Sequence, residues 1–142
     1  MTIISGESGS GKSELAVKFA NNLKNSLYLT LDKDFKTIKK LKELKIDYTN
    51  MSFKSLLDIK YRILERGGLM FNDLDYVIID SLNLITDQKT YLEKVNYLLE
   101  VEKDFKLKII CTLNKPMKFD SLIKGGDNIN LIELKKLIKL FK

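Results

Sequence analysis

Residues 6–13 have the sequence Gly6-Glu7-Ser8-Gly9-Ser10-Gly11-Lys12-Ser13, which matches the phosphate-binding pattern G-x-x-x-x-G-K-[ST] at every fixed position. Residues 2–5 before it predict a short buried strand, and residues 14–23 after it predict a helix. A glycine-rich turn in this context points successive backbone N–H groups at a phosphate, and the helix N-terminus adds partial positive charge. The whole stretch is therefore predicted to bind a nucleoside triphosphate. Lys12 is expected to reach its β- and γ-phosphates and the Ser13 hydroxyl to bind Mg²⁺.

The length of 142 residues predicts a single domain, 1–142, with one α/β core. The formal net charge is +6 and is carried almost entirely by lysine, since Arg62 and Arg66 are the only arginines. Such a charge favours a polyanionic partner, although lysine-rich usage can also reflect genome composition. The chain has no histidine, which excludes histidine metal ligands and histidine general bases.

The single cysteine, Cys111, lies in an apolar run and is expected to be a buried thiol in a reducing cytoplasm. The first residues lead directly into the predicted first strand, so no signal peptide is expected. No apolar run approaches the ~20 residues that a membrane-spanning helix needs. These features predict a cytoplasmic location and no membrane partner.

Apolar patterns along the chain predict alternating strands and helices. Strands are expected at 2–5, 27–31, 46–49, 76–79, 107–113 and 130–134, and helices at 14–23, 35–44, from 52 or 55 to 65, and 88–104. Residues 115–128 are expected to form a loop, and residues 135–142 fit either a helix or a strand. This alternation predicts a three-layer α/β/α fold with a mostly parallel central sheet.

The apolar run 76–79 predicts a buried strand that ends at Asp80. Ligands of open α/β sheets lie at the carboxyl ends of the strands, so Asp80 is expected to hold Mg²⁺ opposite Ser13. A buried strand ending in aspartate is common by itself. Together with the phosphate-binding loop upstream, however, it supplies both parts of a phosphoryl-transfer site.

Ser81 follows Asp80 where many P-loop ATPases have a catalytic glutamate, and the run 27–31 ends at the acidic residue Asp32. This combination resembles the RecA-like P-loop ATPases, which include recombinases, replicative helicases of the DnaB kind and KaiC-like ATPases. The resemblance runs from the phosphate-binding loop to the final strand. It implies ATP as the nucleotide and a RecA-like sheet in a minimal core, of a size expected in a phage or mobile-element gene.

The same resemblance assigns roles to two residues. Asp32 would polarise the attacking water, and Asn114 would sense the γ-phosphate. Both positions also suit residues of purely local importance, because Asp32 could end a strand or cap a helix and Asn114 could form a turn before Pro116.

In RecA-like proteins the loops after the third and fourth strands line the DNA channel of a ring or filament, and the matching segments are 81–89 and 115–128. The second segment contains basic and aromatic residues suited to single-stranded DNA, namely Lys115, Lys118, Phe119 and Lys124. It is equally compatible with a basic surface loop. The resemblance also implies a homo-oligomer in which Lys135 or Lys136 reaches a neighbouring subunit's γ-phosphate.

The leading interpretation is an ATP-hydrolysing protein that acts on single-stranded DNA in recombination, annealing or replication. One alternative is a nucleotide-dependent module that loads or regulates a partner ATPase, favoured by Asp32 standing where the family usually has glutamate. The other is a small nucleoside or nucleotide kinase. Such kinases generally need an arginine-rich lid, and the two arginines of this chain both lie in one predicted helix.

Overall fold

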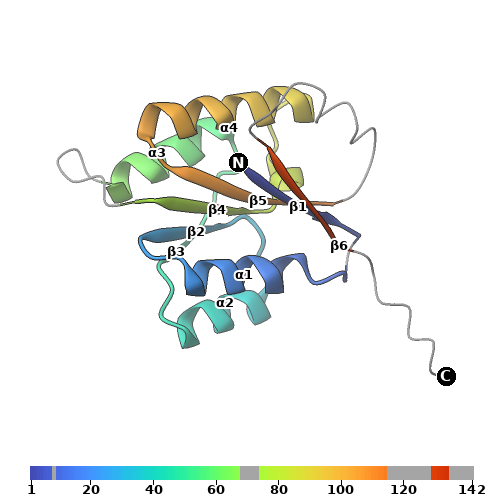
Figure 1. Cartoon of the computed structure of the whole chain (residues 1–142), viewed down its shortest axis with the longest axis vertical. Helices are drawn as coiled ribbons and strands as arrows, with labels where there is room; N and C mark the ends of the chain where they lie inside the picture. Colours follow the sequence, from blue (N-terminus) through green and yellow to red (C-terminus); the bar gives the residue numbers. More distant parts are fainter. Residues whose placement is uncertain (8, 68–73, 115–128, 135–142) are drawn as a thin grey trace.

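The computed structural model describes residues 1–7, 9–67, 74–114 and 129–134. Strands and helices alternate along these residues as the sequence predicts (Figure 1). The strands are β1 (Thr2–Gly6), β2 (Ser26–Thr30), β3 (Tyr48–Asn50), β4 (Tyr76–Asp80), β5 (Lys108–Asn114) and β6 (Asn130–Leu134). The helices are α1 (Lys12–Asn22), α2 (Phe35–Glu43), α3 (Leu56–Gly67), the 3₁₀ turn η1 (Leu82–Leu84) and α4 (Tyr91–Phe105).

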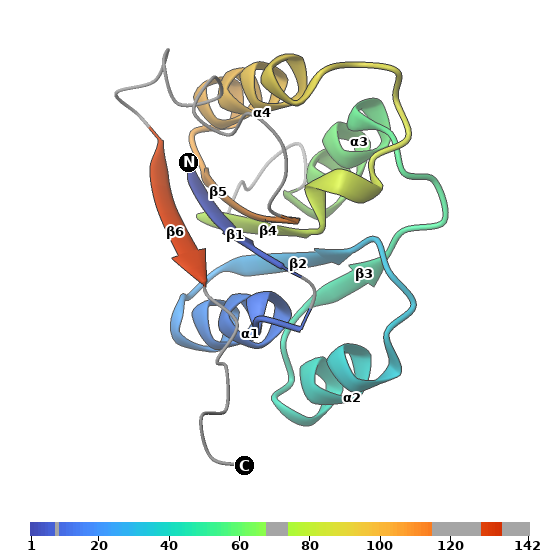
Figure 2. The same ribbon diagram turned by 90° about the vertical axis from the view of Figure 1, so that its right-hand side faces the viewer.

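The six strands form one sheet in the order β3-β2-β4-β5-β1-β6, and every neighbouring pair is parallel. Helices α3 and α4 cover one face of this sheet, and α1 and α2 cover the other (Figures 1 and 2). The predicted α/β fold with a parallel sheet between two helical layers is therefore confirmed. Strand β5 lies between β1 and β4, so the two strands that precede the predicted nucleotide ligands are not direct neighbours.

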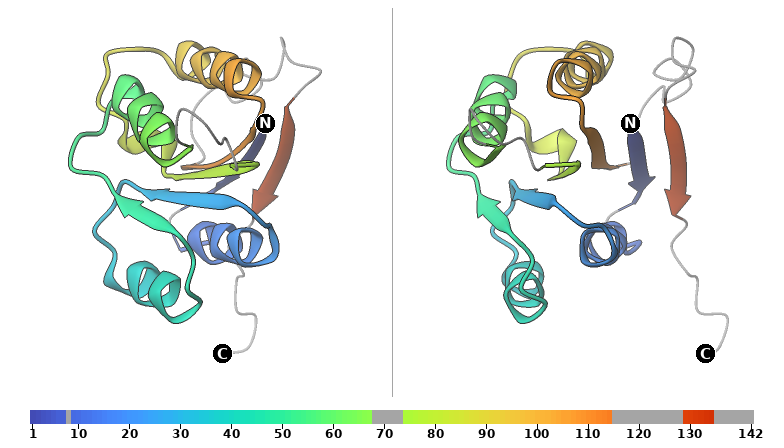
Figure 3. Two further views of the ribbon diagram at one scale, coloured as in Figure 1. Left: turned by 90° about the vertical axis from the view of Figure 1, so that its left-hand side faces the viewer. Right: turned by 60° about the vertical axis from the view of Figure 1, so that its left-hand side comes forward.

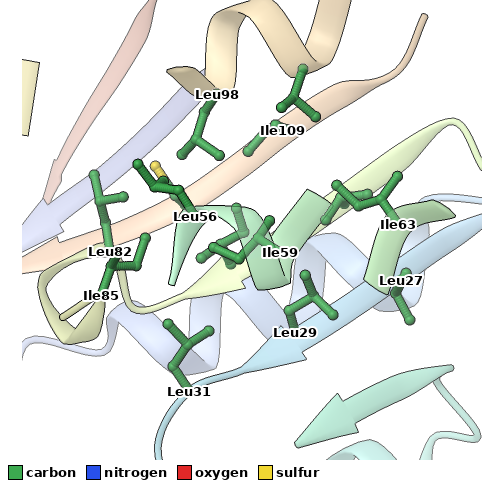
Figure 4. Packing of buried hydrophobic residues seen from close by; sticks show 14 of the residues in the cluster. Leu27, Leu29, Leu31, Leu56, Ile59, Ile63, Leu82, Ile85, Leu98 and Ile109 are labelled. Carbon is green, nitrogen blue, oxygen red and sulfur yellow. The ribbon is translucent and has the colours of Figure 1, made fainter. Parts of the chain in front are cut away.

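Each face of the sheet has its own apolar core, because successive side chains of a strand point to opposite faces. On the α3/α4 side, Leu29, Ile59 and Leu98 belong to the larger cluster (Figure 4). On the other side, Tyr28 and Ile78 pack in a second cluster with residues of α1 and α2. The two clusters lie above and below the sheet in the side views (Figure 3), and they hold the carboxyl ends of the strands in a fixed arrangement.

Capping groups explain where two helices begin. The backbone N–H of Asp58 donates to the Ser55 hydroxyl at 3.0 Å, so Ser55 rather than Ser52 caps α3. Thr90 and Glu93 form a capping box at the start of α4, which therefore begins at Tyr91 and not at residue 88. These boundary errors arose because apolar periodicity alone does not locate the cap.

Cys111 is buried in the middle of β5, as the sequence predicts. Burial raises the pKa of its thiol to about 12. The described helices are all too short or too polar to cross a bilayer. The predicted loop 115–128 and tail 135–142 lie outside the described residues.

Candidate nucleotide site

The predicted phosphate-binding loop connects β1 to α1. The Ser10 N–H donates to the Glu7 carbonyl at 3.1 Å, which closes a tight turn within the loop. Gly9 and Gly11 have φ values of 82° and 93°, a left-handed region that side chains other than glycine rarely adopt. Gly11 immediately precedes the first residue of α1, so the loop leads directly into a helix N-terminus. Ser8 lies outside the described residues.

Gly6 is the residue at which the loop leaves the sheet. A Cβ atom at this position would collide with the Ser10 hydroxyl and lie 2.8 Å from the carbonyl oxygen of Leu134 on β6. The Ser10 hydroxyl itself is buried and has no hydrogen-bond partner among the described residues. A buried donor of this kind fits an anion-binding loop, because a phosphate oxygen can accept its hydrogen bond.

The Lys12 side chain folds back over the loop. Its amine donates to the carbonyl oxygens of Gly6 at 2.8 Å and Glu7 at 2.9 Å. Partial burial lowers the pKa of Lys12, and the negative charge of Asp80 opposes this effect. The structure thus places the Lys12 amine inside the loop and within the electrostatic influence of Asp80.

Asp80 ends β4 as a buried carboxylate, 7% exposed. Its two oxygens each accept a hydrogen bond, from the Tyr28 hydroxyl at 2.5 Å and from the Thr112 hydroxyl at 2.7 Å. These three residues come from the adjacent strands β2, β4 and β5 and point to the sheet face that α1 covers. Burial, followed by the charge of Asp80, raises the pKa of Tyr28, so Tyr28 stays a hydrogen-bond donor at neutral pH. The two hydroxyls fix the orientation of the carboxylate.

Tyr28 and Thr112 were not among the predicted site residues. The available signal was a hydroxyl-bearing side chain inside each of two otherwise apolar strands. In an alternating strand, such residues share a face with the apolar residues two positions away. Their contact with Asp80 follows only from the strand order, which places β4 between β2 and β5.

Residues after Asp80 connect β4 to the end of β5. The peptide bond between Asp80 and Ser81 is cis. The Asn83 side-chain oxygen accepts hydrogen bonds from the Ser81 hydroxyl and, at 3.3 Å, from the backbone N–H of Asn114. Asn83 therefore connects the segment that follows Asp80 to the last residue of β5.

Asp32 and Asn114 lie at the same edge of the sheet, with both side chains exposed. Thr30 pairs with Asp80 in the sheet, so Asp32 follows the strand adjacent to β4. Neither Asp32 nor Asn114 makes a side-chain contact with Lys12 or Asp80 in the part of the chain that the structure describes. The alternative that Asp32 caps the next helix is wrong, because Asp34 caps α2.

The oxygen ligands of this region suit Mg²⁺, which prefers hydroxyl and carboxylate oxygens and retains several waters. Each Asp80 oxygen accepts one hydrogen bond and keeps lone-pair capacity for a metal-bound water. Ser13, the second residue of α1, supplies the hydroxyl. Within the described residues, no group of three or more acidic, cysteine or histidine side chains could hold a metal alone. The donor set therefore fits a cation that the phosphates of a nucleotide also coordinate.

Comparisons with known proteins define the fold. No protein-family model matches the chain, and no curated protein matches its sequence. The ATPase domain of a DnaB-like helicase is similar in structure, with a TM-score of 0.62, 16% identity, and coverage of 92% of this chain and 68% of that one. Drosophila ORC bound to DNA gives a TM-score of 0.51 and 16% identity over 96% of this chain, which spans only 38% of the ORC chain. The chain has a P-loop NTPase fold.

The remaining predicted ligands belong to segments outside the described residues. This holds for the DNA-binding candidates and for the two possible inter-subunit groups, namely Lys115, Lys118, Phe119, Lys124, Lys135 and Lys136. Their roles stay predictions.

Replacing Tyr28 with phenylalanine is expected to destabilise the fold by about 1.5–3 kcal/mol, because the buried Asp80 carboxylate loses one of its two donors. The matched control is Tyr48→Phe, at the residue that pairs with Tyr28 across β2 and β3 and whose hydroxyl has no hydrogen bond within the described residues. Urea unfolding of both variants measures the difference. Equal free energies of unfolding would mean that the Tyr28–Asp80 hydrogen bond contributes nothing.

Proposed function

We propose that this protein is a Mg²⁺-dependent, RecA-like ATPase that acts on single-stranded DNA in recombination, annealing or replication. The observation that carries the proposal is the convergence of a glycine-rich loop containing Lys12 with the buried, doubly hydrogen-bonded Asp80 at one edge of a parallel sheet. The P-loop NTPase fold, shared with the ATPase domain of the DnaB-like helicase, supports the same proposal. Assembly into a ring or filament, or onto a partner ATPase, is part of it.

The proposed mechanism relies on positioning and charge, since phosphoryl transfer requires little covalent chemistry from the protein. Backbone N–H groups of the loop and the α1 N-terminus hold the phosphates. Lys12 exchanges its hydrogen bonds to Gly6 and Glu7 for the β- and γ-phosphate oxygens. Bound Mg²⁺, held by Ser13 and through water by Asp80, supplies charge neutralisation.

Asp32 is the proposed residue that orients and deprotonates the attacking water. Its exposed carboxylate follows β2, next to the strand that ends at Asp80. Asn114 is the proposed sensor of the γ-phosphate, and its backbone link to Asn83 gives it a direct connection to the segment after Asp80.

The test measures ATP hydrolysis with and without single-stranded DNA, and nucleotide binding in parallel. Asp32→Asn is expected to bind ATP normally and to hydrolyse it at least about 10²-fold more slowly, the usual contribution of a general base. Asp34→Asn is the matched control, because it removes one charge two residues away and asparagine still caps a helix.

Each outcome bears on a defined part of the proposal. An Asp32→Asn variant that hydrolyses ATP at the parent rate would remove the assigned water-activating group. Tight ATP binding by the parent without hydrolysis would favour the nucleotide-dependent regulatory module instead. Phosphoryl transfer to a nucleoside or nucleotide would favour the small kinase.

A further inference from the structure

Helix α2 and its two ends gather most of the positive charge of the chain. Residues 33–45 contain six lysines and two acidic residues, a formal charge of +4 out of a net +6 for the whole sequence. All six lysines are exposed, and they are Lys33, Lys36, Lys39, Lys40, Lys42 and Lys45.

Neighbouring acidic groups leave this charge largely uncompensated. The Asp34 carboxylate accepts hydrogen bonds from the Lys36 N–H at 3.1 Å and the Thr37 hydroxyl at 3.0 Å, so it serves the helix N-terminus. Asp47, beyond the helix, pairs with Arg66. Within the described part of the chain, none of the six lysines forms an ion pair with a carboxylate.

An aromatic side chain stands at the start of this charged surface. Phe35 is the first residue of α2 and is 85% exposed, so it contributes nothing to either core. Helical spacing places Phe35, Lys39 and Lys42 on one side at i, i+4 and i+7, opposite the buried residues Thr37 and Leu41. We call the outward surface formed by Phe35, Lys36, Lys39, Lys40 and Lys42 the lysine face.

The lysine face lies beside the candidate nucleotide site. Helix α2 follows β2, whose last residue, Thr30, pairs with Asp80. Helix α2 also packs against α1, the helix that begins with Lys12 (Figures 2 and 3). The Phe35 end of α2 therefore starts from the sheet edge that carries the predicted nucleotide ligands.

We propose that the lysine face binds single-stranded nucleic acid, with its lysines on successive phosphates and Phe35 stacked on a base. A row of uncompensated lysines complements a phosphate backbone, and an exposed aromatic ring adjacent to it suits base stacking without sequence preference. A membrane surface fits less well, because the apolar side of α2, with Thr37 and Leu41, is already buried against the fold and cannot insert into lipid. The inference rests on the proposed single-strand function but needs neither Asp32 nor hydrolysis.

The test is a titration of a fluorescent oligo-dT by anisotropy at several salt concentrations. Lys39→Ala/Lys42→Ala is expected to weaken binding at least about tenfold at low salt and to reduce the slope of log K against log salt by about 1.4, or about 0.7 for each phosphate that is no longer bound. Phe35→Ala is expected to weaken binding by about tenfold with little change in slope. The matched control, Lys103→Ala/Lys108→Ala, removes two exposed lysines from α4 and β5 and is expected to change neither quantity.

Four results would overturn the inference. Equal losses in the lysine-face and control variants would mean that only net charge matters. Loss with Lys118→Ala but not with the lysine-face variants would place the strand on residues 115–128 and leave the proposed function intact. Absence of oligo-dT binding by the parent, with Mg-ATP stabilisation retained, would remove both the inference and the DNA role. Binding of anionic vesicles instead of oligo-dT, lost in the lysine-face variants, would assign the surface to a membrane.

Discussion

Lys12→Ala is expected to abolish the thermal and chemical stabilisation of the protein by Mg-ATP. A ligand at a hundredfold excess over its dissociation constant stabilises a folded protein by about 2.7 kcal/mol, and the variant should lose nearly all of this. The reason is that Lys12 provides the side-chain charge at the centre of the loop, where its amine already lies between the Gly6 and Glu7 carbonyls. Urea unfolding with and without Mg-ATP measures the effect.

The control for this experiment is Lys18→Ala, which removes an exposed lysine from the same helix. It should keep the full stabilisation by Mg-ATP. Without nucleotide, Lys12→Ala should cost the fold no more than about 1 kcal/mol, the usual net contribution of hydrogen bonds to backbone carbonyls. A Lys12→Ala variant that Mg-ATP stabilises as strongly as the parent would show that the loop is not the triphosphate site.

Asp80→Asn is expected to remove the Mg²⁺ dependence of nucleotide binding. Asparagine keeps one acceptor oxygen but introduces an NH₂ group, so the Tyr28 and Thr112 hydroxyls can no longer both donate to a carboxylate. The variant should also lose about 1–3 kcal/mol of stability from the mismatched buried group. Calorimetric titration with ATP in Mg²⁺ and in EDTA should give the same affinity for the variant and a much higher affinity in Mg²⁺ for the parent.

The matched control is Asp75→Asn, which removes one charge just before the opposite end of the same strand. Asp75 accepts a hydrogen bond from Asn25 at 3.0 Å far from the loop, so its loss should leave the Mg²⁺ effect intact. Retention of the Mg²⁺ effect in Asp80→Asn would require a different metal ligand.

The sequence predicted those parts of the site that depend on local geometry. The loop from Gly6 to Ser13 was identifiable because its glycines, lysine and serine act through neighbouring backbone atoms. Asp80 was identifiable because a buried strand must deliver its last residue to the ligand edge of the sheet. The parallel sheet followed from the alternation of strands and helices.

Long-range geometry was not predictable in the same way. Tyr28 and Asp80 are 52 positions apart, and their hydrogen bond depends on which strands are neighbours. The cap of α2 was also open, since aspartate suits such a position at either Asp32 or Asp34, and the structure selects Asp34.

The strand order has a consequence for how the chain folds. Strand β1 precedes the other strands in the sequence, yet its sheet partners are β5 and β6, so Ile3 pairs with Cys111 and Leu131. During synthesis β1 therefore has neither partner until residues beyond 107 have emerged, while β2, β3 and β4 can already pair with one another. Pairing between residues so far apart in the chain is slow. The edge of the sheet that carries Lys12 is thus completed last, and a nascent chain gains nucleotide-binding ability only after β5 and β6 have been made.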